Sequence, residues 1–111
     1  MLQRQGRLRI CSRLLSHSFA TELDPRLLCT FAEDPTLTSS YAKHFVGGMQ
    51  GNDSTYLKVA STLKHFAAYS QETGRINDPV VVSAQDMADT YLPAFETGVK
   101  QGNASGLMCS V

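Results

Sequence analysis

The sequence has no excess of charge of either sign, because its 10 lysines and arginines balance its 10 aspartates and glutamates. A chain without a basic or acidic surplus is not expected to be held on nucleic acid or on a membrane surface by bulk charge. Its apolar runs also fall short of the roughly 18 residues typical of a transmembrane helix. We therefore expect neither a nucleic-acid partner nor a membrane partner.

Cysteine is scarce and unpatterned. The three cysteines, Cys11, Cys29 and Cys109, are widely spaced and form no C-x-x-C pair or Cys/His cluster. Zinc sites depend on such closely spaced ligands, and a Gly-rich phosphate-binding loop is missing as well. The sequence thus predicts neither a metal site nor a cofactor. Free thiols are the expected state of the cysteines, with one disulfide and one remaining thiol as the alternative.

The first 20 residues differ from the rest, because they contain arginines and serines but no Asp or Glu. Such an acid-free start is similar to an organelle transit peptide, and it lacks the apolar core of a secretory signal. We favour a different interpretation, in which this segment is disordered or is not the natural start of the domain. Residues 1–31 are therefore left unassigned, and localisation is not predicted.

Regular structure becomes predictable from Asp34 onward. An Asp N-cap followed by Pro35 at the first helical position is a strong helix start, because proline lacks the N–H that would be unsatisfied there. The pattern predicts a helix from about Thr36 to about Met49, ended by Gly51. Its predicted apolar stripe consists of Leu37, Tyr41, Phe45 and Met49, with Ala42 and Val46 beside it.

A largely buried strand is predicted over residues 56–63, directly before Lys64 and His65. Parallel α/β folds build their sites at the carboxyl ends of such strands. Lysine donates three hydrogen bonds and histidine donates or accepts, so this pair suits a ligand rich in hydroxyls or carrying negative charge. The alternative is a lysine in water beside a histidine bonded to backbone. Among the acidic residues, Glu72 in the polar loop that follows is the candidate for this site.

The tripeptide Lys-His-Phe also occurs at residues 43–45, on the predicted helix. There Phe45 belongs to the apolar stripe, so Lys43 and His44 are expected to face water. The flanking residues of the two copies differ, and we therefore do not interpret them as an internal repeat.

The last part of the chain predicts a helix between two buried strands. Ser83 and Asp86 have the spacing of a capping box, Pro93 is expected to kink or divide the helix, and Gly102 ends it. Residues 104–111 predict the second strand, and a helical crossover between the strands predicts that they are parallel. The expected apolar stripe of this helix is Met87, Tyr91, Phe95 and Val99.

Several short blocks of the sequence are familiar as a set. They are Glu33-Asp34-Pro35, Gly48-x-Gln50-Gly51, Leu57-Lys58-Val59-Ala60, Lys64-His65-Phe66, Val82-Ser83-x-Gln85-Asp86 and Met108-Cys109-Ser110. In this order they resemble the N-terminal domain of glycoside hydrolase family 3, and its β-glucosidase and β-xylosidase members most. The resemblance implies an α/β fold over residues 32–111: a partial (β/α)8 TIM-like barrel of about two to three βα units, since a whole barrel needs ~250 residues.

What the resemblance implies for function is a retaining β-glycosidase of carbohydrate metabolism, acting on O-glycosyl bonds of β-glucosides or β-xylosides. In that family the Lys-His pair hydrogen-bonds the sugar of the first subsite and its peptide bond is often cis, so Lys64 and His65 are the expected substrate-binding residues. The family's nucleophile and acid/base match no residue here. The isolated chain is thus expected to show no turnover and to expose a large apolar surface.

Other interpretations stay open. The chain could be a non-catalytic remnant that binds sugar or another protein, or a small α/β binding protein unrelated to glycosidases. Family members are often secreted, but no signal peptide is visible in this sequence.

Overall fold

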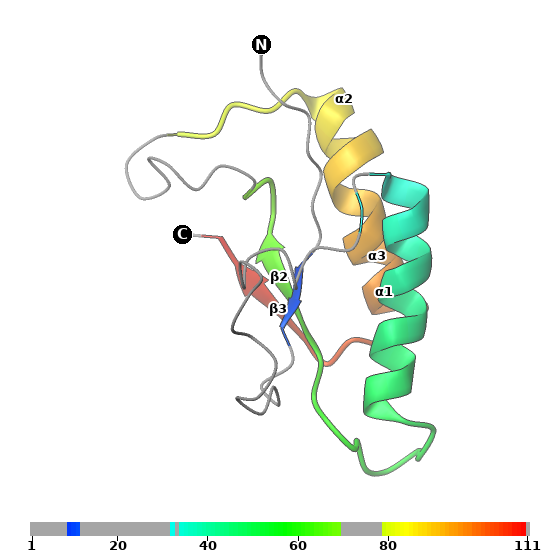
Figure 1. The fold of residues 1–111 in the computed structure, drawn as a ribbon. Coiled ribbons are helices and arrows are strands. Elements are labelled where there is room, and N and C mark those ends of the chain that lie inside the picture. Colours follow the sequence, from blue (N-terminus) through cyan, green and yellow to red (C-terminus); the bar gives the residue numbers. More distant parts are fainter. Residues whose placement is uncertain (1–8, 12–31, 33, 70–78, 111) are drawn as a thin grey trace, which may run out of the picture.

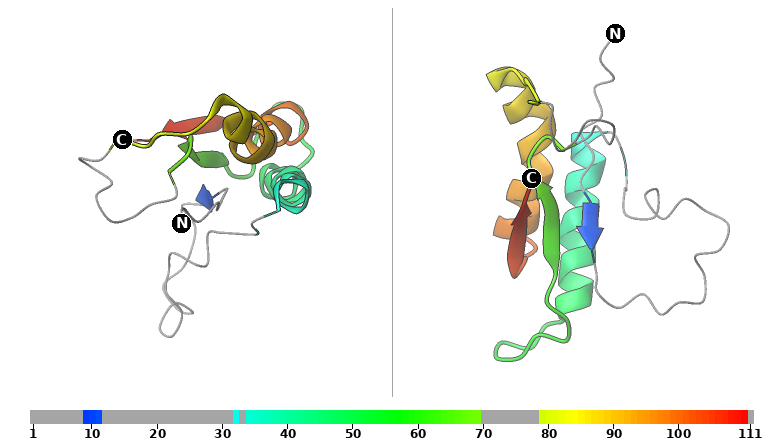
Figure 2. Two further views of the ribbon diagram at one scale, coloured as in Figure 1. Left: turned by 90° about the horizontal axis from the view of Figure 1, so that it is seen from above. Right: turned by 90° about the vertical axis from the view of Figure 1, so that its left-hand side faces the viewer.

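The computed structural model describes residues 9–11, 32, 34–69 and 79–110. Within them, two packed helices lie beside a three-stranded sheet with the strand order β1-β2-β3 (Figure 1, Figure 2). The elements are β1 (Arg9–Cys11), α1 (Pro35–Gln50), β2 (Thr62–Phe66), α2 (Ala84–Asp86), the π-helical segment η1 (Met87–Tyr91), α3 (Leu92–Lys100) and β3 (Gly106–Cys109). The loop over residues 70–78, with Glu72, and the cysteine Cys29 lie outside the described residues.

The predicted ends of helix α1 are confirmed. The Asp34 carboxylate accepts hydrogen bonds from the backbone N–H groups of Thr36 and Leu37, at 3.2 and 2.9 Å. At the other end Gly51 has a φ of 77°, which is a left-handed conformation that favours glycine, and its N–H donates to the Gly47 carbonyl. Both ends follow from local side-chain chemistry, and this explains why the sequence alone located them.

The predicted buried face of α1 is confirmed at Ala42 and Val46 and is wrong at three of its large apolar residues. Leu37, Tyr41 and Phe45 are 48%, 49% and 36% exposed. The side chains that α1 buries are those of Thr38, Ala42, Val46 and Gln50. This neighbouring stripe is small enough to let the backbone beyond it come close: a Cβ on Gly98 would lie 3.6 Å from the Ala42 Cβ, and one on Gly102 would lie 3.2 Å from the Val46 Cβ. Close helix packing therefore selects the small stripe over the aromatic one.

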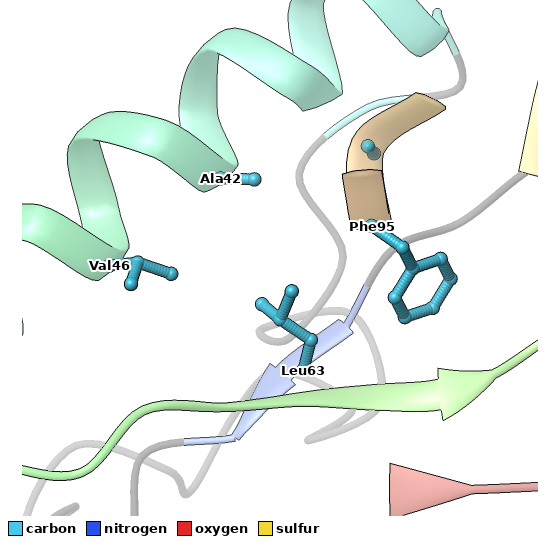
Figure 3. Close-up of a cluster of buried hydrophobic side chains, with 5 residues drawn as sticks. Ala42, Val46, Leu63 and Phe95 are labelled. Atoms are coloured by element: carbon cyan, nitrogen blue, oxygen red, sulfur yellow. The ribbon is translucent and has the colours of Figure 1, made fainter. Parts of the chain in front are cut away.

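Leu63 of β2 lies at the centre of the hydrophobic core (Figure 3). Its side chain is fully buried, between α1 and α3. The other members of the cluster are Ala42, Val46, Ala94 and Phe95. At its edge the Phe66 ring meets the Phe95 ring edge-on, with 5.2 Å between the ring centroids. One strand residue thus joins both helices to the sheet.

Strand β2 begins later than predicted. Thr62–Phe66 replaces the expected 56–63, so Lys64 and His65 lie within the strand and not after its end. Residues before it are held in a turn, because the Asp53 carboxylate accepts the backbone N–H groups of Thr55 and Tyr56 at 2.8 and 3.0 Å. Hydrogen bonds from a side chain to the backbone compete with strand formation. Here residues 53–56 form the turn, although the apolar pattern of the following residues predicted a strand.

This turn should open in acid. The hydrogen bonds from the backbone N–H groups of Thr55 and Tyr56 lower the pKa of Asp53 below its ordinary 3.8. A lowered pKa means that the carboxylate stabilises the turn above that ordinary value, and that the contribution disappears as pH falls through the lowered pKa. An NMR titration of the Asp53 carboxyl should give a midpoint below 3.8 with a parallel shift of the Thr55 amide. A midpoint at or above 3.8 would contradict this assignment.

The second predicted helix is divided, as expected at Pro93. The Ser83 hydroxyl accepts the Asp86 N–H at 3.0 Å, which confirms Ser83 as the N-cap, and it donates to the Asp86 carboxylate at 2.9 Å. Before Pro93 the helix widens into η1, where the Leu92 N–H donates to the Met87 carbonyl five residues back. The predicted stripe is confirmed at Phe95, and Val99, which is 38% exposed, is not part of the buried face. The residues that α3 buries are Ala94, Phe95 and Gly98.

The sheet combines one expected pairing with one unexpected pairing. Strands β2 and β3 are parallel, as predicted, with Thr62 opposite Gly106 and Lys64 opposite Met108. β3 is shorter than the expected 104–111, and Leu107 and Met108 are 44% and 47% exposed where a buried strand was predicted. β1 pairs antiparallel to β2 in a segment for which no element was predicted. The described residues therefore show an α/β fold with a parallel pair, and they are too few to close a barrel.

No helix in the described ranges combines the length and apolarity needed to cross a membrane.

Candidate functional site

Lys64 and His65 lie next to each other on β2, the middle strand of the sheet. Both residues are partly buried. Lys64 is paired with Arg9 of β1 on one side and with Met108 of β3 on the other. The backbone at Lys64 is thus supported by a strand on each side.

The pairing of β2 with β3 changes at His65. Lys64 lies opposite Met108, and the next pair is Phe66 with Cys109, so His65 has no counterpart on β3. This arrangement is a β-bulge, a feature that re-aims a side chain and is frequent beside active sites. The peptide bonds Lys64–His65 and Phe66–Ala67 are both cis, the first of them as the resemblance implied. Because of the bulge, the His65 side chain leaves the strand in another direction than it would from a regular strand.

Behind the bulge the chain folds back on itself. Ala68 has a φ of 59°, and the turn that contains it brings the Tyr69 ring to 4.6 Å from the His65 ring, measured between centroids, at an interplanar angle of 46°. The Ser110 N–H donates to the Phe66 carbonyl at 2.9 Å, and this bond ties the end of β2 to the residue after β3. The contact between Tyr69 and His65 depends on this turn, which no local sequence pattern predicts.

The pair offers hydrogen-bond donors and an imidazole, but no carboxylate lies next to it in the sequence or in the described strand pairs. Several described carboxylates have local structural partners instead. Asp34 caps α1, and the Asp86 carboxylate accepts the Ser83 hydroxyl. A hydrogen bond from Lys100, together with its charge, lowers the pKa of Glu96. Over the described residues no group of three His, Cys, Asp or Glu could hold a metal ion. The described residues thus place hydrogen-bond donors here, which suit a ligand rich in hydroxyls or carrying negative charge.

Comparison with known proteins decides the family. The profile of the glycosyl hydrolase family 3 N terminal domain matches residues 21–111. This chain belongs to glycoside hydrolase family 3. The match includes residues 21–31 as well as the blocks that carried the resemblance. The N-terminal domain of family 3 is TIM-barrel-like, and the parallel β2–β3 pair with its helical crossover is consistent with that fold.

Three curated relatives of this family 3 chain have names that describe xylosidases. It is 42% identical over 88 residues to Beta-D-xylosidase 3 of Arabidopsis thaliana, covering 73% of this chain and 11% of that protein. It is 42% identical over 85 residues to an exo-1,4-beta-xylosidase of Emericella nidulans, with the same coverage. For the xylan 1,4-beta-xylosidase of Xylanibacter ruminicola the identity is 39%, over 73% of this chain and 10% of that protein. The chain thus spans about a tenth of the length of these relatives. No solved structure matches it significantly.

Proposed function

We propose that Lys64 and His65 bind the sugar of a β-xyloside in a retaining family 3 glycosidase. The observation that carries this proposal is the placement of both residues on the middle strand, with a bulge at His65. A sugar ring presents several hydroxyls, each a donor and an acceptor. The lysine ammonium supplies up to three donors, and the imidazole supplies a donor or an acceptor.

The substrate class is supported by the names of the relatives. The three proteins compared above are called xylosidases, whereas the residues alone left glucosides and xylosides equally open. Xylose lacks the hydroxymethyl group of glucose, so a site shaped for xylose rejects glucose by the room this group needs. We therefore place β-xylosides before β-glucosides as the substrate of the protein to which this chain belongs.

In this proposal the chain supplies sugar binding and not the reacting carboxylates. A retaining glycosidase needs a nucleophile and a general acid/base about 5 Å apart. Among the described carboxylates, those of Asp34 and Asp53 accept backbone N–H groups in a cap and a turn, and that of Asp86 accepts the Ser83 hydroxyl. These partnerships also favour the second candidate function, a non-catalytic module that binds the same sugars.

Hydrolysis and binding assays on the purified native protein separate these possibilities. Nitrophenyl β-D-xyloside should be cleaved with retention of anomeric configuration, and with a higher kcat/KM than the β-D-glucoside. Saturable xylose binding without cleavage would favour the non-catalytic module. If the protein neither cleaved these glycosides nor bound xylose, the proposed function would be wrong.

A further inference from the structure

Gln50, the last residue of α1, is almost completely buried at 3% exposure, and its amide joins three separate segments. Its side-chain NH2 donates to the Asn103 carbonyl at 2.7 Å. Its side-chain oxygen accepts the backbone N–H groups of Ser61 and Ser105, at 3.2 and 3.0 Å. A buried polar group without partners is costly, and here both lone pairs of the amide oxygen are used. Gln50 therefore connects the end of α1 to the residue before β2 and to the loop before β3.

A second set of bonds closes the same junction. The Ser105 hydroxyl donates to the Ser61 carbonyl at 2.9 Å, and the Gly106 N–H donates to that carbonyl at 3.2 Å. Ser61 is thus held against Ser105 and Gly106 immediately before the first pair of the parallel strands, Thr62 with Gly106. We call Gln50, Ser61 and Ser105 the amide clasp.

The amide clasp lies just before the first residue pair of β2 and β3, where its contacts can set the register between the two strands. A one-residue slip turns every side chain of a strand to the opposite face, and burial of one face normally prevents it. β3 lacks that protection, because Leu107 and Met108 are both substantially exposed and no alternation of burial distinguishes its faces. The hydrogen bonds of the buried Gln50 amide can fix the register of β3, which the side chains of β3 do not fix.

We infer that Gln50 is a positioning residue for the sugar site, acting through the register of β2. With Thr62 fixed opposite Gly106, Lys64 lies opposite Met108 and the bulge falls at His65. Leu63 holds β2 in the core, so β3 is the strand that could slip; a slip of one residue would move the bulge away from the imidazole. The inference rests on the proposed function, in which Lys64 and His65 contact the sugar.

The test compares Gln50→Met with Gln101→Met in the native protein. Methionine keeps the length and much of the volume of glutamine but makes none of the three hydrogen bonds, and Gln101 is exposed at the end of α3. We expect Gln50→Met to raise the dissociation constant for xylose by about tenfold or more, since three hydrogen bonds are lost. Gln101→Met should leave it unchanged. Gln50→Glu, which still accepts from Ser61 and Ser105, should recover part of the affinity.

A purely structural role predicts a different pattern. It would lower the folded fraction, and so the apparent kcat, while the folded molecules kept the original KM. An unchanged KM and xylose affinity in folded Gln50→Met protein would overturn the inference. If Gln50→Met does not fold, Ser105→Ala decides, because it removes only the Ser105 hydroxyl bond to Ser61: weaker xylose binding supports the clasp and unchanged binding overturns it. Absence of xylose binding by the unaltered protein would instead show that the proposed function is wrong.

Discussion

Lys64→Ala is expected to lower kcat/KM for a β-xyloside by roughly one to two orders of magnitude, because hydrogen bonds made by a charged group are worth about 1.5–3 kcal/mol. Lys64 lies on the middle strand between two paired neighbours, so its backbone position does not depend on its side chain. The loss should therefore come from the missing ammonium and not from a displaced strand. Steady-state kinetics on the native protein, with circular dichroism as a check of folding, measures it.

The chain contains its own control for this experiment. Lys43 and His44 repeat the Lys-His-Phe tripeptide on helix α1, where both side chains are exposed, as predicted. The His44 imidazole is bonded to the Ser40 carbonyl of the same helix at 2.8 Å. Lys43→Ala should leave the kinetics unchanged. Equal losses from Lys43→Ala and Lys64→Ala, or no loss from the latter, would remove Lys64 from the sugar site.

Leu63→Ala is expected to destabilise the protein by about 2–5 kcal/mol, the usual cost of truncating a fully buried leucine. Leu63 is completely buried and is the strand residue that both helices cover (Figure 3). Urea denaturation followed by circular dichroism measures the change in the free energy of unfolding. The matched control is Leu57→Ala in the loop before β2, where the side chain is 51% exposed and the expected change is within about 0.5 kcal/mol.

Gly98 allows a sharper version of this experiment. A Cβ at position 98 would lie 2.7 Å from the Leu63 Cδ1, so Gly98→Ala should cost about 1–3 kcal/mol through overpacking. In Leu63→Ala/Gly98→Ala the clashing methyl group is gone and the new one partly fills the space. The double variant should then be more stable than the sum of the single changes predicts. Strict additivity would show that the two residues do not contact each other in solution.

Local chemistry explains which parts of the fold were predictable from the sequence. The helix starts at Asp34 and Ser83 and the glycine end at Gly51 depend on side chains within a few residues of each other, and all three predictions are confirmed. The predicted buried face of α1 was wrong at Leu37, Tyr41 and Phe45 because two adjacent stripes both have helical spacing. Only the approach of Gly98 and Gly102, from far along the chain, decides between them.

The strands show the same division between local and distant contacts. The β2–β3 pairing followed from the helix between the strands and is confirmed as parallel. The start of β2 was misplaced because the turn at Asp53 outweighs the apolar pattern of residues 56–60. β1 carries no periodic pattern, and its pairing with β2 has no local cause.

For the candidate site, the sequence pointed to Lys64 and His65 through their neighbouring positions and through the family resemblance, and the family itself is confirmed. Their contact with sugar stays a prediction. The partners of Tyr69 and Gln50 could not be predicted from the sequence, although Gln50 lies in one of the blocks that carry the resemblance. Tyr69 reaches His65 through the turn at Ala68, and Gln50 bonds residues more than 50 positions away.

A crystal structure of the native protein with xylose bound would decide whether this strand forms a sugar site. We predict the Lys64 Nζ and an imidazole nitrogen of His65 at about 3 Å from hydroxyl oxygens of one xylose ring, beside the bulge in β2. A xylose bound at full occupancy elsewhere, with neither residue in hydrogen-bonding distance, would contradict the proposed role of the Lys64–His65 pair.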